Sequence, residues 1–205
     1  MRIGVFGGTF DPVHIAHLIL AEQCREQVRL DQVWFVPAAR PPHKLERPIT
    51  AFRQRVEMLQ LAIAGQPAFR VDELENERAG ISYTADTLAT LKQRHPEDDF
   101  HFIIGSDCLP DLTHWHDPAR IMELAGLIIV NREGWPVWPP QQLREALGLP
   151  GQIQIRQEIV EMPAVSVSSS DLRLRAASRR SLRYLVPRAV ECYIETHHLY
   201  GPAST

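Results

Sequence analysis

The chain has 205 residues, of which 44% are hydrophobic and 23% charged, so it is long enough and apolar enough to bury a core. Its formal net charge of −3 gives no overall positive field, which argues against a nucleic-acid partner. No stretch could span a bilayer and the three cysteines are widely spaced, so we expect one cytoplasmic domain over residues 1–205, with reduced thiols and no membrane partner.

Apolar runs alternate with amphipathic segments, which is the βαβ rhythm of a mostly parallel sheet covered by helices. The runs expected to form strands are, in chain order, Arg2–Gly7, Gln32–Val36, Phe69–Glu73, Phe100–Gly105, Leu127–Asn131 and Ile153–Glu161. The pattern predicts an α/β fold, a Rossmann-like doubly wound sheet with helices on both faces.

Helical spacing of apolar residues predicts the segments between the strands. Helices are expected at Ile15–Val28, from Thr50 as N-cap through Ile63, at Thr84–Arg94, and from Pro187 in a small helical C-terminal part over residues 180–200. The proline-rich segments Pro37–Pro48 and Pro136–Pro140 are expected to be loops.

The first strand runs directly into a glycine turn and a helix start, which brings several backbone amides into one small space. These amides belong to Gly7, Gly8, Thr9 and Phe10. Unpaired N–H groups and the positive end of a helix dipole form a natural phosphate site. His14 and His17 follow three residues apart, so they face the same way and either can donate a hydrogen bond to phosphate. A metal site would need a third ligand, and neither HExxH nor a nearby Cys or His provides one.

A second candidate anion site lies near the C-terminus. Three consecutive residues that favour helix N-caps, Ser168, Ser169 and Ser170, end a strand-like run and precede a helix carrying Arg173. Hydroxyls and free amides at a helix start, with an arginine one turn in, can hold an anion. The alternative is a well-capped helix without a ligand.

Polar residues also follow two central strands. Ligands bind beyond the carboxyl ends of strands in an open parallel sheet, and Gly105 and Asp107 lie at such an end. The Asp107 carboxylate could accept hydrogen bonds from ribose, or Asp107 or Ser106 could cap a helix. Arg132 likewise follows the carboxyl end of the next predicted strand, so it is a further candidate for ligand binding.

The sequence Gly8-Thr9-Phe10-Asp11-Pro12, followed by His14-x-x-His17, resembles the nucleotidyltransferase superfamily with an (H/T)xGH signature. The GGTFDPVH form is most similar to bacterial nicotinate mononucleotide adenylyltransferases, with Ala16 in place of the glycine between the histidines. Three further stretches resemble the same proteins: Val167–Arg173 their ISSTxxR motif, Pro41–Lys44 their PxHK loop, and Gly105–His116 their GSDxxxxLxxWH pattern. The resemblance covers nearly the whole chain.

This resemblance implies that ATP and nicotinate mononucleotide react to give nicotinic acid adenine dinucleotide and diphosphate, a step of NAD biosynthesis. It implies that Mg²⁺ is carried by the ATP phosphates and that the catalytic residues are His14, His17, Lys44 and Arg173. The implied ATP-binding residues are Gly7, Gly8, Thr9, Phe10, Gly105, Asp107, Arg132, Ser168, Ser169 and Ser170.

The implied mononucleotide-binding residues are Tyr83, Thr84 and Trp115. A tryptophan face can stack on a pyridine ring, although tryptophans more often lie in cores. Amides at the helix start near Thr84 could receive the nicotinate carboxylate, which a nicotinamide could not match electrostatically.

Other functions stay open at this point. Nicotinamide mononucleotide or pantetheine phosphate could be the acceptor, CTP could be the donor, or the chain could bind ATP as a sensor without turnover. A dehydrogenase is disfavoured, because Gly4, Gly7 and Gly8 do not form GxGxxG. The sequence leaves open whether the chain is a homo-oligomer.

Overall fold

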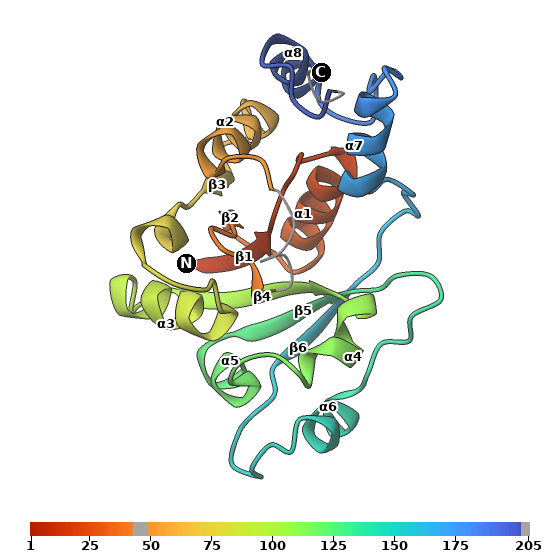
Figure 1. Cartoon of the computed structure of the whole chain (residues 1–205). Helices are drawn as coiled ribbons and strands as arrows, with labels where there is room; N and C mark the ends of the chain where they lie inside the picture. Colours follow the sequence, from red (N-terminus) through yellow and green to blue (C-terminus); the bar gives the residue numbers. More distant parts are fainter. Residues whose placement is uncertain (43–48, 202–205) are drawn as a thin grey trace.

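The computed structural model describes residues 1–42 and 49–201, and its centre is a six-stranded sheet in the order β3-β2-β1-β4-β5-β6 (Figure 1). The strands are β1 (Arg2–Gly8), β2 (Gln32–Pro37), β3 (Phe69–Val71), β4 (Asp99–Gly105), β5 (Gly126–Val130) and β6 (Gln157–Val160). Every neighbouring pair is parallel, so the predicted α/β fold and its sheet are confirmed.

The two edge strands are shorter than the sequence predicted. β3 ends at Val71 because the Asp72 carboxylate accepts the N–H of Leu74 (3.1 Å) and turns the chain into a 3₁₀ helix, Leu74–Glu77. β6 begins only at Gln157, since the N–H of Ile153 is bonded to Pro150 O (3.1 Å) in a turn before the strand.

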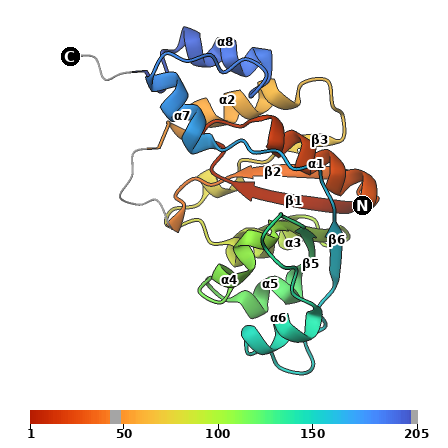
Figure 2. The same cartoon turned by 90° about the vertical axis from the view of Figure 1, so that its right-hand side faces the viewer.

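Helices cover both faces of the sheet (Figure 2). They are α1 (Ile15–Gln27), α2 (Phe52–Ile63), α3 (Thr84–Arg94), α4 (Leu109–Leu112), α5 (Pro118–Leu124), α6 (Pro140–Ala146), α7 (Ser169–Ala177) and α8 (Arg188–Thr196). Helices α1, α2, α7 and α8 pack on one face and α3 to α6 on the other. Side chains alternate between these layers along each strand: Trp34 and Val36 face the α3 side, and Val33 and Phe35 face the α1 side.

Several helix predictions need correction. Thr50 does not cap α2, because Ala51 occupies the N-cap position and the Thr50 N–H is bonded to Asp11 Oδ2 (3.3 Å). Helix α5 was not predicted, although Asp117 accepts the N–H of Arg120 (3.1 Å) and a proline occupies the first helical position. Helix α6 begins at Pro140, the last residue of a segment that was expected to be a loop.

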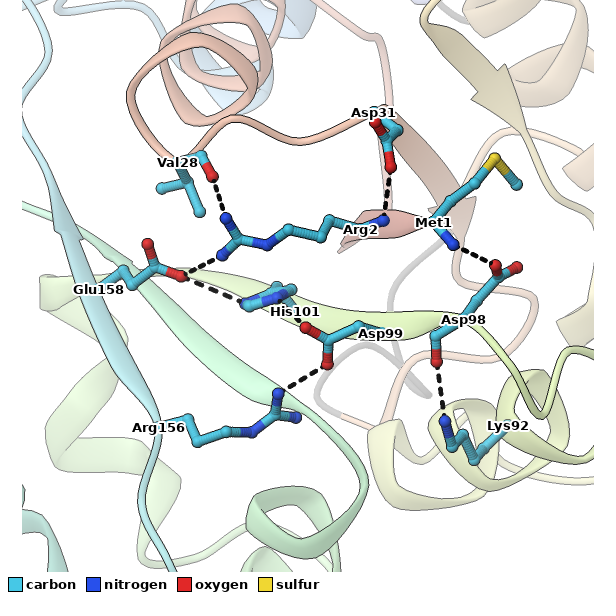
Figure 3. A network of polar contacts seen from close by, with 10 residues as sticks. All are labelled: Met1, Arg2, Val28, Asp31, Lys92, Asp98, Asp99, His101, Arg156 and Glu158. Atoms are coloured by element: carbon cyan, nitrogen blue, oxygen red, sulfur yellow. Dashed lines mark hydrogen bonds and ion pairs between the residues drawn. The ribbon is translucent and has the colours of Figure 1, made fainter.

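The amino ends of the strands are joined by charged side chains (Figure 3). Arg2 of β1 pairs with Glu158 of β6 (2.7 Å), and Arg156 pairs with Asp99 of β4 (2.6 Å). Between these pairs lies the buried His101, whose Nε2 is 2.9 Å from Asp99 Oδ2. This network holds three strands together at the end of the sheet opposite the carboxyl ends.

The strand order reverses at β1. The chain adds β2 and β3 on one side of β1 and then continues with β4 on the other side. In an open parallel sheet, a crevice opens beyond the carboxyl ends of the strands at such a reversal, and ligands bind there. The glycine turn after β1 lies at this position.

Candidate active site

The turn after β1 is shaped by close packing of its own residues. Ala38 donates its N–H to Gly8 O (2.8 Å), and Phe10 adopts a positive φ of 50°. The Phe10 ring then lies over Gly8, where an added Cβ would come within 2.9 Å of the ring, so only glycine fits. The ring also packs against Phe6 and Phe35 in the core, so the Phe10 side chain is buried and only its backbone is available to a ligand at the turn.

The two histidines do face the same way. Their rings stack with centroids 3.6 Å apart at the start of α1. The His14 backbone N–H donates to His17 Nδ1 (3.2 Å), so the neutral His17 ring carries its proton on Nε2. His14 Nδ1 is buried and has no hydrogen-bond partner within residues 1–42 and 49–201. A buried polar atom without a partner is typical of a site that a ligand completes.

Both histidines are neutral at pH 7. Burial, followed by the positive charge of Arg132, lowers the pKa of His14 to about 4. Burial holds the pKa of His17 well below its ordinary value, and the charges of His14 and Arg132 act in the same direction with smaller effects. In the free protein the pair therefore presents neutral hydrogen-bond donors.

The low pKa of His14 predicts a pH-dependent stability. The unfolded chain takes up this proton near its ordinary pKa of 6.5 and the folded chain only near 4, so the stabilisation is complete above pH 6.5 and is lost as the pH falls to 4. The expected loss is about 2 to 3 kcal/mol in the free energy of unfolding. Denaturant titrations of wild type and His14→Gln between pH 7 and 4 measure it. An equal slope in both proteins would contradict this assignment.

The serine–arginine segment lies directly against the glycine turn. Arg173 donates to Asp11 O (2.7 Å) and to Ser170 Oγ (3.3 Å), and Ser169 Oγ donates to Pro12 O (2.9 Å). Ser168 is the N-cap of α7, and its hydroxyl is bonded to Asp171. The structure thus joins the two predicted anion sites and gives the Ser168 side chain a capping role.

A cavity of about 560 Å³ opens beside the histidines. Its lining is His14, Ala16, His17, Leu20, Asn131, Arg132, Glu133 and the segment 161–167. At its edge, Arg132 Nε lies 3.3 Å from Asp107 Oδ1, and the Arg132 N–H donates to Ser106 Oγ (2.9 Å). An added Cβ at Gly105 would lie 2.2 Å from Asp107 Oδ1, so a larger residue here would displace the Asp107 side chain. Neither Ser106 nor Asp107 caps a helix, so the capping alternative for these residues is wrong.

A second cavity, of about 230 Å³, lies against the glycine turn. Its lining is Gly7, Gly8, Thr9, Val36, Ala38, Pro41, Pro42, Glu75, Ser82, Tyr83, Thr84, Phe102, His114, Trp115 and His116. Trp115 is partly buried with its ring edge-to-face on Phe102 (5.9 Å), so it belongs both to the core and to the cavity wall. Tyr83 is the N-cap residue of α3, and Thr84 is the first helical residue.

One predicted residue, Lys44, lies outside the described residues. The part of its loop that is described approaches the start of α3: Ser82 donates its N–H to Arg40 O (3.0 Å), and Arg40 donates its N–H to Ser82 Oγ (3.1 Å). Pro41 and Pro42 line the second cavity.

Comparison with known proteins identifies the family. Residues 5–175 match a family model described as cytidylyltransferase-like. The chain is 45% identical to a Thermus thermophilus protein named probable nicotinate-nucleotide adenylyltransferase, over 98% of this chain and 100% of that protein. This chain belongs to the nicotinate-nucleotide adenylyltransferase family.

Two further likenesses agree with that membership. A Salinibacter ruber protein of the same name is 41% identical over 98% of this chain and 99% of its own length. The structure of Plasmodium falciparum nicotinic acid mononucleotide adenylyltransferase complexed with NaAD matches with a TM-score of 0.79, at 22% identity and 97% coverage of both chains. At that identity the match shows a shared fold.

Two residues that hold the glycine turn in place are not evident from the sequence motifs of this family member. Arg55 is 1% exposed and donates to three backbone carbonyls, Thr9 O (2.7 Å), Thr50 O (3.0 Å) and Ala38 O (2.9 Å). It thereby connects the turn with the end of β2 and the start of α2. The available signal was its position on the apolar face of α2, beside Leu59, where an exposed arginine would not be expected.

The second residue that holds the glycine turn lies in the C-terminal segment. Tyr200 donates its hydroxyl hydrogen bond to the buried Asp11 Oδ1 (2.7 Å).

Tyr200→Phe removes this donor and leaves a buried carboxylate oxygen with one partner fewer, so we expect a loss of about 1 to 3 kcal/mol in the free energy of unfolding. Urea titration measures the loss. Tyr184→Phe is the matched control, because Tyr184 is 82% exposed. Equal stability of the two variants would show that the bond contributes little.

No helix within residues 1–42 and 49–201 is long and apolar enough to cross a membrane. The same residues contain no group of three His, Cys, Asp or Glu side chains arranged to hold a metal ion.

Proposed function

We propose that this chain transfers the adenylyl group of ATP to nicotinate mononucleotide, forming nicotinic acid adenine dinucleotide and diphosphate in NAD biosynthesis. The observation that carries the proposal is the pair of cavities on the segment from β1 to α1. One is lined by the two histidines and the other by Trp115 and the start of α3. Two cavities beside one phosphate-binding turn suit a reaction that joins two nucleotides, and membership of the family supports the same conclusion.

The reaction needs no nucleophilic side chain. The 5′-phosphate of the mononucleotide is already an anion and attacks the α-phosphorus in line, while diphosphate leaves. The protein contributes by positioning both substrates and stabilising charge that develops on the phosphate oxygens. His17 would donate from Nε2 to the α-phosphate, and His14 would donate to the triphosphate, which completes its unpartnered ring nitrogen.

The remaining ATP contacts follow from the placement of the side chains. Arg173 and the amides of Ser169 and Ser170 at the start of α7 would hold the β- and γ-phosphates, and Lys44 would neutralise further oxygens. Asp107 would accept from the ribose hydroxyls at the carboxyl end of β4, with Arg132 beside the adenine.

The acceptor would occupy the second cavity. Its pyridine ring would stack on Trp115, and the backbone amides at the start of α3, near Tyr83 and Thr84, would receive its carboxylate. A carboxylate interacts more strongly with the positive end of a helix dipole than a neutral amide does. We therefore propose a preference for nicotinate over nicotinamide mononucleotide.

Mg²⁺ would reach the site with ATP. The described residues offer no carboxylate cage, and Mg²⁺ commonly keeps water ligands while it binds substrate phosphates, so the residues present fit a metal carried by the nucleotide. When bound, Mg²⁺ would supply neutralising charge to the diphosphate leaving group. The three cysteines are free thiols, and we place the reaction in the cytoplasm.

The test is pyrophosphate release from ATP and Mg²⁺ with three acceptors assayed side by side: nicotinate mononucleotide, nicotinamide mononucleotide and phosphopantetheine. Fast turnover with the acid alone is the expected result. Preference for another acceptor would overturn the assignment of the second cavity, and no turnover with any acceptor would favour an ATP sensor. Replacing ATP by CTP tests the nucleotide donor.

A further inference from the structure

Glu75 is an acidic side chain in the wall of the second cavity that the proposed reaction does not use. It belongs to the 3₁₀ helix Leu74–Glu77 between β3 and α3, and it is 8% exposed. Among the lining residues that the structure describes, its side chain alone is acidic, and the remainder combine apolar side chains with hydroxyl groups and the imidazoles of His114 and His116.

Hydrogen bonds hold Glu75 as an acceptor. Arg78 Nη2 donates to Thr87 Oγ1 (3.0 Å), so the hydroxyl proton of Thr87 is directed to Glu75 Oε1 (2.7 Å). The second oxygen, Oε2, accepts a long bond from the Ala39 N–H (3.4 Å). Because both oxygens accept, the arrangement suits the ionised carboxylate.

Among the residues that the structure describes, none forms a contact ion pair with Glu75. Within residues 1–42 and 49–201, no Lys, Arg or His nitrogen lies within 4.0 Å of its oxygens. Arg55 attracts it at longer range, but all three nitrogens of that guanidinium are bonded to carbonyls. Arg78 reaches Glu75 only through Thr87. Buried charges are normally paired, so a cation in the cavity would complete this carboxylate.

The proposed acceptor brings such a cation. Its ring nitrogen is quaternary because it bears the ribose, so the pyridinium ring carries a positive charge that a benzene ring of the same shape lacks. We propose that Glu75 is a specificity-determining residue that selects the cationic pyridinium ring over a neutral ring. This inference rests on the proposed function. In this arrangement the carboxylate of the ligand interacts with the positively polarised start of helix α3. The positive charge of the pyridinium ring interacts with the negative charge of Glu75.

Binding measurements test this role independently of turnover. The probes are nicotinate mononucleotide and its C-ribosyl benzoate 5′-phosphate analogue, in which a neutral benzene ring bears the same carboxylate. Calorimetric titration should give a Kd for the pyridinium ligand about tenfold or more below that of the neutral one in wild type. Glu75→Gln, which keeps an acceptor oxygen for Thr87, should bring this ratio close to one, mainly by weakening the pyridinium ligand.

Two variants keep the result interpretable. Glu75→Asp retains the charge and should retain discrimination even where overall affinity falls. Glu77→Gln is the matched control in the same 3₁₀ helix, since Glu77 is exposed and paired with Arg94 (2.6 Å), and its ratio should equal that of wild type. Thermal unfolding of each variant shows whether it is folded at the assay temperature.

The outcomes separate the two proposals. A ratio that is unchanged in Glu75→Gln, or wild type that binds both rings equally, overturns the role of Glu75. Wild type that discriminates in binding but releases no pyrophosphate refutes the proposed reaction alone and leaves the selection of the cationic ring supported.

Discussion

His17→Ala is expected to lower kcat by about 10²- to 10³-fold, the usual effect of removing one hydrogen-bond donor to a transition-state oxyanion. The KM for ATP should change far less, because the contact strengthens as charge develops on the α-phosphate. The donor is well defined: the His14 N–H bond to His17 Nδ1 leaves Nε2 protonated, and the ring is held between His14 and Phe10.

The measurement is steady-state pyrophosphate release at saturating ATP and acceptor, together with ATP binding by calorimetry. His17→Gln keeps an N–H donor and should recover part of the lost rate. His198→Ala is the control, since His198 is exposed and lines a separate cavity between α7 and α8. A fall in ATP affinity that accounts for the whole loss of kcat/KM would assign His17 to ground-state binding.

Trp115→Ala is expected to raise the KM for nicotinate mononucleotide by about 10- to 100-fold, the range for loss of one aromatic stacking partner. The KM for ATP should stay near its wild-type value, because Trp115 lines only the smaller cavity and Arg132 and the histidines line the other. The measurement is the KM for each substrate with the other held at saturation.

The conservative control is Trp115→Phe. Since Trp115 also packs on Phe102, alanine removes core contacts as well as the stacking face, whereas phenylalanine keeps an aromatic ring in the cavity wall. The KM for the mononucleotide should therefore lie between those of wild type and Trp115→Ala. An unchanged KM in Trp115→Ala would leave Trp115 with its packing role alone.

The sequence predicted the features that depend on neighbouring residues: the central strands, the longer helices, the glycine turn and the histidine pair. Continuous apolar runs identified the central strands, and helical spacing identified α1, α2, α3 and α8. The glycine turn and the histidine pair were recognisable because turn geometry and helix facing are settled within a few residues. Short helices such as α5 were missed, although Asp117 followed by Pro118 is a helix-start signal.

Only the tertiary structure decided how these pieces form one site. Arg173 reaches Asp11 across 162 residues and Tyr200 reaches it across 189, and neither contact leaves a mark in local periodicity. The position of Arg55 on the apolar face of α2 marks it as unusual, but its three carbonyl partners lie in separate segments that only the fold brings together. Local hydrogen bonds and the spacing of apolar side chains depend on residues that are close in the sequence, so short stretches of sequence predict them. The partners of a buried charge depend on packing summed over the whole chain, so they emerge only when the fold is complete.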